Sequence, residues 1–191
     1  IISYEPDTNF NGDVSFSFLA KDPSEETTDI ATINITVSAI NDAPVLASVS
    51  DVSFDEDGSG SLSLSSSDND EGDSATFSIT GGSDITATLD GSSVSFSSPA
   101  NYNGSESFTA IVTDSGDLSD SQSFTVTVNA VNDAPTADAA SGTTDEDQSI
   151  VITLSGDDID GDNLTFSIVG DPSNGSVTLD GTLATYTPTT N

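Results

Sequence analysis

The sequence predicts an all-β protein made of tandem β-sandwiches, each with about seven strands and about 91 residues. The first observation behind this prediction is a repeat, because Asn-Asp-Ala-Pro occupies both Asn41–Pro44 and Asn132–Pro135. The second is an alternation of apolar residues with Ser or Thr in nearly every apolar segment, as in Phe124–Val128. This is the period of a strand with one buried and one solvated face, and no segment has helical periodicity.

Other motifs recur in the same order and mark equivalent points of each repeat. Asp-Glu-Asp, Asp-x-Asp, aromatic-Asn-Gly and a single aspartate each occur twice: Asp55–Asp57 and Asp145–Asp147, Asp68/Asp70 and Asp158/Asp160, Phe10–Gly12 and Tyr102–Gly104, and Asp22 and Asp114. Because the period equals the length of a small domain, we interpret the chain as an array of similar modules.

The strands of the central module are expected where alternating segments lie between Gly, Asp, Asn and Pro turns: near 45–54, 60–66, 75–80, 85–89, 93–97, 105–113 and 122–130. This number of strands is typical of an immunoglobulin-like Greek-key sandwich. Asp90-Gly91, matched by Asp180-Gly181, predicts a hairpin between the fourth and fifth strands. The recurring aromatic residues are interpreted as core or corner packing rather than as a carbohydrate-stacking surface: Phe10, Phe96, Tyr102 and Tyr186.

The ends of the sequence follow the same repeat. Residues 1–9 align without a gap on residues 183–191, at an offset of 182 residues or two periods. We therefore expect 1–42 to be the C-terminal half of a repeat, 43–133 a complete repeat, and 134–191 the N-terminal half of the next. The last half would be completed by residues 1–42 of a neighbouring copy or by continuing chain, and the nine-residue overlap favours a continuous fibre. The short connection Ser38–Pro44 would leave successive modules nearly in line.

The composition excludes several functions. A formal net charge of −32, with Lys21 as the sole basic residue, excludes binding to nucleic acid or to an anionic membrane surface. The chain has no Cys and no His, which excludes disulfides, zinc sites and thiol or imidazole catalysis. No apolar stretch approaches the roughly 20 residues of a membrane span, so membrane insertion is not expected.

Aspartate dominates the acidic residues, with 26 Asp against 7 Glu. Short carboxylates in turns suit the binding of a cation, because nearby backbone carbonyls can add ligands. Carboxylates that converge on a junction between modules repel one another unless a cation neutralises them. Ca²⁺ takes six to eight oxygens in irregular geometry and fits this supply better than Mg²⁺, so Ca²⁺ is the expected cofactor. Adaptation to high salt is a compatible interpretation of the same acidity.

Several of these motifs together resemble a known family. Val131–Pro135 is similar to the linker signature of cadherin repeats, Asp68–Asp73 before Phe77 resembles the cadherin Asp-x-Asp-x-Gly stretch, and Asp114–Gly116 resembles a later Asp-x-Gly turn. With Asn101–Gly104, the combination resembles the bacterial cadherin-like tandem repeats of large surface adhesins and extracellular repeat proteins. The resemblance extends over the whole chain and implies cadherin-like Greek-key sandwiches with calcium held between modules.

The resemblance also implies which residues bind the metal. The first junction would use Asn41, Asp42, Asp68, Asp70 and Asp114. The second would use Glu56, Asn132, Asp133, Asp158 and Asp160. Between copies, Asp22 would complete the second junction and Glu146 would reach the first junction of the following copy. Asp55 and Asp57 are further candidates, and the Leu-Asp-Arg-Glu motif of animal cadherins is missing.

Two rival chemistries are rejected. Asp158–Asp162 imitates the start of an EF-hand loop, but Val169 stands at the twelfth position, where a bidentate Glu is required. Paired carboxylates also suggest a glycosidase, yet these pairs lie in turns at module ends, no Trp lines a cleft, and nothing nearby would raise the pKa of one carboxyl. The protein is therefore not expected to be an enzyme.

The expected function is mechanical: calcium-rigidified extender repeats of a long bacterial cell-surface or extracellular filament, related to adhesion. Adjacent repeats of the same protein would be the partners, head to tail, and a surface glycan or cell-surface target would bind through other domains. One alternative is a self-assembling extracellular fibre or matrix polymer. Another is a glycan-binding accessory module of a secreted hydrolase.

Overall fold

A computed structural model of the protein describes residues 2–27, 29–70 and 72–190. Ile1 and Asn191, at the outer ends of the first and third expected domains, and Glu71, within the Asp-x-Asp-x-Gly stretch, lie outside the described residues. The described part contains sixteen β-strands and no helix, so it also contains no helix suited to crossing a membrane. Both the all-β class and the tandem arrangement are confirmed.

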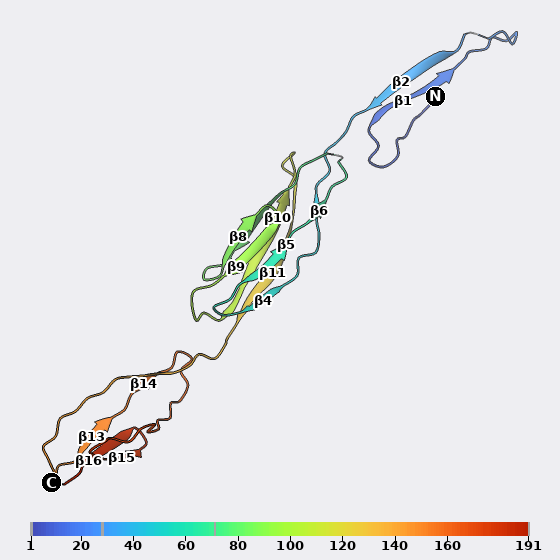
Figure 1. Ribbon diagram of the computed structural model, residues 1–191. Coiled ribbons are helices and arrows are strands. Elements are labelled where there is room, and N and C mark those ends of the chain that lie inside the picture. Colours follow the sequence, from blue (N-terminus) through green and yellow to red (C-terminus); the bar gives the residue numbers. More distant parts are fainter. Residues whose placement is uncertain (1, 28, 71, 191) are drawn as a thin grey trace.

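Three groups of strands follow one another along an elongated molecule (Figure 1). We call them the first hairpin (residues 12–37), the middle unit (residues 45–129) and the third unit (residues 136–188). The first hairpin pairs β1 (Gly12–Phe18) with β2 (Ala31–Val37), antiparallel. We call the two linkers between the groups the first junction (residues 38–44) and the second junction (residues 130–135).

The middle unit is a sandwich of a four-stranded and a three-stranded sheet, with a short two-stranded ladder at one end. The four-stranded sheet has the order β4-β11-β10-β7, in which β11 and β4 run parallel: β4 (Val52–Asp55), β7 (Thr76–Gly81), β10 (Gly104–Thr113) and β11 (Ser119–Asn129). The other strands form the order β5-β9-β8 and the pair β3-β6: β3 (Val45–Leu46), β5 (Gly60–Ser63), β6 (Ser66–Ser67), β8 (Thr86–Asp90) and β9 (Ser93–Ser97).

The alternating sequence places one apolar row of each sheet in a shared core. Phe96, Phe108 and Phe124 meet at its centre, with ring centroids 5.4 to 6.0 Å apart. Phe96 and Phe108 are each 1 % exposed, and Tyr102 packs against the edge of the same core. The interpretation of Phe96 and Tyr102 as packing residues is therefore confirmed.

Two expected strands are each divided in the structure. The expected strand at 45–54 is β3 and β4, and the expected strand at 60–66 is β5 and β6, because the chain changes sheets in both places. Where the chain passes from β3 to β4, a side chain of β11 takes the place of the missing hydrogen bonds between strands. Gln122 donates to the Leu46 carbonyl at 2.8 Å and accepts from the Val49 amide at 3.1 Å. Satisfied in this way, the backbone can leave one sheet before it joins the other.

The predicted hairpin at Asp90-Gly91 is present. β8 and β9 pair antiparallel with Asp90 opposite Ser93, and Gly91 has a φ of +61°. A left-handed φ in a tight turn between strands is available to glycine without strain, which explains the residue at this position.

The third unit repeats only part of the middle unit. Its strands form the order β13-β16-β15 and the pair β12-β14: β12 (Thr136–Ala137), β13 (Ile150–Thr153), β14 (Gly156–Asp157), β15 (Gly175–Asp180) and β16 (Leu183–Pro188). Leu164–Ile168 repeats the sequence of β7, yet it forms no strand. In the middle unit β7 pairs with β10, and within the described residues no strand lies beside Leu164–Ile168. A pairing partner, rather than local propensity, decides the conformation of this segment.

Candidate metal centres at the junctions

Each junction is fastened to the unit that follows it by the same backbone hydrogen bond. The Asp42 amide donates to Asp70 Oδ2 at 2.7 Å, and the Asp133 amide donates to Asp160 Oδ2 at 2.6 Å. The Asp-x-Asp turns are themselves held by a local bond, in which Asp68 accepts from the Asp70 amide at 2.9 Å. The repeated sequence thus forms the same turn twice and presents carboxylates to the linker each time.

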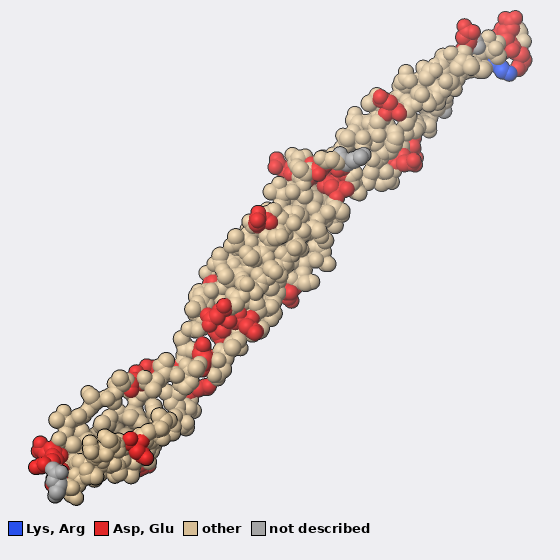
Figure 2. Space-filling view, in the orientation of Figure 1, with Lys and Arg blue, Asp and Glu red and all other residues tan. Residues whose placement is uncertain are grey.

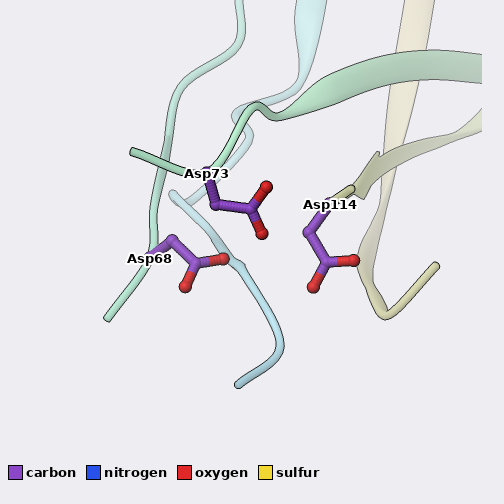
Figure 3. A group of neighbouring side chains, drawn as sticks. All are labelled: Asp68, Asp73 and Asp114. Carbon is purple, nitrogen blue, oxygen red and sulfur yellow. The ribbon is translucent and has the colours of Figure 1, made fainter. Parts of the chain in front are cut away.

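At the first junction three aspartates from two loops converge (Figure 3). One carboxylate oxygen from each of Asp68, Asp73 and Asp114 lies within 4.8 Å of the others. Asp114 is 7 % exposed, and its Oδ2 accepts a hydrogen bond from the Asn41 side chain at 2.8 Å. The loop before β7 and the turn after β10 bring these residues together, because β7 and β10 are neighbours in one sheet.

The first-junction cluster contains acceptors without donors. Asp68 Oδ2 and Asp73 Oδ2 are buried and have no hydrogen-bond partner. The other oxygen of Asp73 accepts from the Ser74 amide at 2.7 Å and from the Ser115 amide at 3.3 Å. The Ser115 hydroxyl, and after it the Ser74 amide, lowers the pKa of Asp73, so this carboxyl is ionised at neutral pH. A buried anionic oxygen without a donor is a position suited to a cation.

The second junction repeats this arrangement with residues from both units. Glu56, 8 % exposed, accepts from the Val131 amide at 2.6 Å. Asp133 Oδ2 is buried and has no hydrogen-bond partner. Burial, followed by the charges of Asp160, Asp57, Glu56 and Asp158, raises the pKa of Asp133. The same four carboxylates are therefore close enough to Asp133 to destabilise its charge.

No basic side chain of the protein compensates these charges. Lys21 is the sole basic residue of the sequence, and it pairs with Glu25 at 2.9 Å in the β1–β2 turn. Figure 2 shows Asp and Glu gathered near the two linkers and at the outer ends, with fewer along the flank of the middle unit. Charge neutralisation at the junctions must come from solution.

The structure brings most of the expected ligands together within this chain. At the first junction the linker contacts the Asp-x-Asp turn and the turn after β10, as described for Asn41, Asp42, Asp68, Asp70 and Asp114. At the second junction Asn132 donates to the Asp133 carbonyl at 2.8 Å, while Asp158 accepts from the Asp160 amide at 3.0 Å. Glu56 and Asp133 complete this group.

Two expected ligands lie elsewhere. Asp22 lies in the β1–β2 turn, where it accepts hydrogen bonds from the amides two and four residues later, as Asp114 does in the β10–β11 turn. Glu146 lies in the loop between β12 and β13. Both segments are at the outer ends of the molecule, away from the two junctions (Figure 1). Their role as ligands between copies stays a prediction.

One carboxylate at the junctions is missing from the expected ligand set, and another stands in it only as a further candidate. Asp73 belongs to the three-aspartate cluster, and Asp57 contributes to the raised pKa of Asp133 while accepting from the Asn101 amide at 3.1 Å. The sequence contains a signal for both, because Asp73 ends the Asp-x-Asp-x-Gly stretch and Asp57 ends the repeated Asp-Glu-Asp. Both lie close to the expected ligands only in the folded chain.

The donor chemistry of both centres fits a hard divalent cation. All the side-chain atoms that could bind a metal at the two junctions are carboxylate or amide oxygens. Among the described residues, the buried oxygens without a hydrogen-bond partner number two at the first junction and one at the second. Six to eight oxygens in irregular geometry suit Ca²⁺, whereas Mg²⁺ requires a near-ideal octahedron. The residues present therefore fit calcium.

The sequence repeat and the sandwich together define a class of protein. The family model for the bacterial Ig domain matches residues 41–127 and 132–191. The chain belongs to this family. No curated protein matches the sequence.

Solved structures with the same fold are cadherin ectodomain fragments. Human CDH23 EC21-23 matches with a TM-score of 0.52 and 16 % identity, over 94 % of this chain and 65 % of that one. Extracellular cadherin domains 1-5 of Protocadherin Gamma B2 match with a TM-score of 0.50 and 16 % identity, over 94 % of this chain and 40 % of that one. PcdhgB3 EC1-4 matches with a TM-score of 0.52 and 12 % identity, over 98 % of this chain and 57 % of that one. The chain thus spans between 40 % and 65 % of these structures, and the likeness is one of fold.

Proposed function

We propose that the chain is a calcium-stiffened spacer in a long bacterial extracellular or cell-surface filament, related to adhesion and without catalytic activity. The observation that carries this proposal is the pair of junctions at which buried, unpartnered carboxylate oxygens converge: Asp68 Oδ2 and Asp73 Oδ2 at the first, and Asp133 Oδ2 at the second. The bacterial Ig family and the cadherin-like fold support a structural role.

Calcium would stiffen the rod by linking groups that belong to different segments. At the second junction, Glu56 from the middle unit, Asp133 from the linker and Asp160 from the third unit would share the ion. Without a cation their charges oppose this approach, as the raised pKa of Asp133 indicates. Extracellular calcium modules bind with Kd of about 10⁻⁴–10⁻³ M, and a hundredfold excess stabilises the bound state by about 2.7 kcal/mol per ion.

The proposal divides the chain into the three domains expected from the repeat, 1–42, 43–133 and 134–191. The break in the family match between residues 127 and 132 supports the second boundary. The aromatic residues give no support to a glycan-binding module, since Phe96 is buried and Tyr102 packs on the core.

Calcium titration of the whole chain tests the proposal. Isothermal calorimetry should show saturable binding, and Asp68→Asn and Asp133→Asn should each remove part of the heat, because they alter different junctions. Asp90→Asn, in the exposed β8–β9 turn, is the matched control and should bind as the wild type does. Small-angle scattering should show a longer, narrower distribution of shapes in calcium than in chelator. Wild-type heats in both junction variants would refute the ligand assignment, and an unchanged scattering curve would refute stiffening.

A further inference from the structure

The residue before the repeated aromatic-Asn-Gly motif is an asparagine in both copies, and both copies form the same turn. In the loop between β9 and β10 (residues 98–103), the Tyr102 amide donates to the Pro99 carbonyl at 3.3 Å, and the equivalent bond before β1 is 3.1 Å long. The asparagine of each turn has a left-handed backbone, with a φ of +57° at Asn101 and +58° at Asn9. Asparagine tolerates this conformation better than most residues, so the repeat preserves a conformation as well as a sequence.

The turn of the middle unit is held from two sides. Tyr102 packs against the core and lies over Gly104, where a Cβ would be 2.8 Å from the Tyr102 hydroxyl oxygen. The backbone N–H of Asn101 donates to Asp57 Oδ1 at 3.1 Å, which ties the β9–β10 loop to the β4–β5 turn. The Asn101 side chain itself makes no hydrogen bond within the described part of the chain. The fold therefore fixes the position of Asn101 and leaves its side-chain oxygen for another partner.

Asn101 lies at the second junction. It borders a cleft of about 350 Å³ together with Asp133 of the linker and Asp158 of the third unit. Every other described residue that lines this cleft belongs to the linker or to the third unit. Asp133 is also the residue whose Oδ2 is buried without a hydrogen-bond partner. Asn101 thus brings an amide from the middle unit to the carboxylates of the two segments that follow.

The first junction repeats this placement. Asn9 borders a cleft of about 680 Å³ with Asn41 of the linker and with Asp70 and Asp73 of the middle unit. Asp73 belongs to the three-aspartate cluster, and its Oδ2 is likewise buried and unpartnered. The same residue of the repeat therefore meets the carboxylates of the next unit at both linkers.

We propose that Asn101 and Asn9 are further calcium ligands, each contributing its side-chain oxygen from the unit before a linker to the ion held by the linker and the unit after it. This inference rests on the calcium binding proposed above. An amide oxygen is an ordinary ligand for Ca²⁺. Because it carries no net charge, it adds a ligand without adding to the repulsion among the carboxylates.

The second junction requires oxygens beyond its carboxylates. Ca²⁺ takes six to eight oxygen ligands. Glu56 Oε1 accepts from the Val131 amide, and Asp160 Oδ2 accepts from the Asp133 amide, so these oxygens are only partly available to an ion. The side-chain oxygen of Asn101 has no such competitor among the described residues.

A second attachment on the middle unit also explains how an ion can fix a direction. Glu56 lies in the β4–β5 turn and Asn101 in the β9–β10 loop, so two separate segments of the middle unit would hold the same ion. One attachment leaves the next unit free to pivot in every direction about it, whereas two attachments restrict the pivot to one axis. Asn101 would therefore contribute to the alignment of the units as well as to the affinity for calcium.

Titration of the full chain with calcium chloride, in the wild type and in two variants of Asn101, provides the test. Asn101→Gly keeps the left-handed backbone without strain and removes the side-chain oxygen, so it should weaken calcium binding at the second junction about tenfold. Asn101→Asp keeps an oxygen at the same place and tolerates the same φ, so it should bind at least as tightly as the wild type. Asn103→Ala, in the same loop but outside the cleft, is the matched control and should bind as the wild type does.

Nuclear magnetic resonance separates the two junctions in this titration. The backbone amide signal of Asp133 reports calcium at the second junction, and that of Asp42 reports calcium at the first. The side-chain carbonyl carbon of Asn101 should shift in parallel with the Asp133 signal, because its oxygen enters the coordination shell. Asn101→Gly should weaken only the second-junction curve, and Asn9→Gly should weaken only the first.

The outcomes distinguish this inference from the proposed function. A wild type without saturable calcium binding overturns both. A wild type that binds calcium, together with an Asn101→Gly variant that binds equally tightly, overturns the ligand role of Asn101 and leaves the metal centres in place. A side-chain signal of wild-type Asn101 that stays unmoved at saturating calcium overturns this role as well, and so does an equal loss of affinity in Asn101→Gly and Asn101→Asp. Loss in the Gly variant with recovery in the Asp variant supports it, since Gly suits a left-handed turn at least as well as Asn.

Discussion

Replacing Asp68 by Asn should change the stability of the middle unit in opposite senses with and without calcium. Asp68 Oδ1 already accepts from the Asp70 amide at 2.9 Å, and the Asn carbonyl can keep this bond. The amide nitrogen then takes the place of the unpartnered Oδ2 and faces Asp73 and Asp114. The substitution removes a ligand for calcium and, at the same time, a source of repulsion.

The size of the effect without calcium follows from the geometry of the cluster. Two unit charges 4.8 Å apart repel by about 0.9 kcal/mol in bulk water, and Asp68 has two such neighbours. Screening at physiological salt roughly halves the sum, which leaves about 1 kcal/mol. In chelator the variant should therefore be more stable than the wild type, with a Tm higher by about 4–8 °C for a domain of this size.

In calcium the wild type should become more stable than the Asp68→Asn variant. At a hundredfold excess over Kd the ion stabilises the wild type by about 2.7 kcal/mol, whereas a tenfold weaker site gains about 1.4 kcal/mol at the same concentration. Thermal unfolding by circular dichroism in chelator and in calcium measures how much calcium stabilises the wild type and how much it stabilises the variant. Asp90→Asn should follow the wild type in both solutions. A variant that is less stable in chelator, or that gains as much from calcium as the wild type, would refute the reasoning.

Three further predictions concern the middle unit. Glu106 accepts hydrogen bonds from the Ser83 hydroxyl and from the backbone amides of residues 83–85. The hydroxyl, and after it the amides, lowers the pKa of Glu106 from 4.5 to about 2. Its stabilisation is complete above the ordinary pKa and is lost as the pH falls through about 2, so Glu106→Gln should cost about 1–2 kcal/mol at neutral pH and flatten this acid dependence in denaturant titrations. Phe108→Ala should cost about 3–5 kcal/mol in the same assay, while Ser107→Ala on the solvated face should change little, and equal losses would contradict the assigned core. Gly91→Ala should cost about 1 kcal/mol because of the positive φ, and Gly91→Asn should cost less, since Asn tolerates this conformation.

Much of the fold was accessible from the sequence because each signal was local. Alternation of Phe, Val and Ala with Ser and Thr marks strands, and Asp90-Gly91 marks a turn through the backbone conformation it requires. The division of the expected strand at 45–54 was not accessible, since it depends on Gln122, more than seventy residues later, which binds the backbone at the crossing. Leu164–Ile168 shows the same limit, because an identical pattern becomes a strand only beside a partner.

The ligands of the candidate metal centres also include some that the sequence identifies and some that only the fold identifies. Asp68, Asp70, Asp158 and Asp160 were identifiable from a repeated motif that fixes its own turn. Asp73 is not in the expected set and Asp57 is there only as a further candidate, although both lie in the repeated motifs. Their proximity to the other carboxylates arises from the pairing of β7 with β10 and from the approach of the linker to the end of the middle unit.

The same hydrogen bond fastens both linkers, from the Asp42 amide to Asp70 and from the Asp133 amide to Asp160. This repetition has a geometric consequence for longer arrays. A fixed attachment repeated at every linker applies the same rotation and the same translation each time. Successive repeats then lie on a screw axis, and the handedness and pitch of the filament depend on one angle. A substitution that shifts this angle by a few degrees in every repeat changes the superhelix over its whole length.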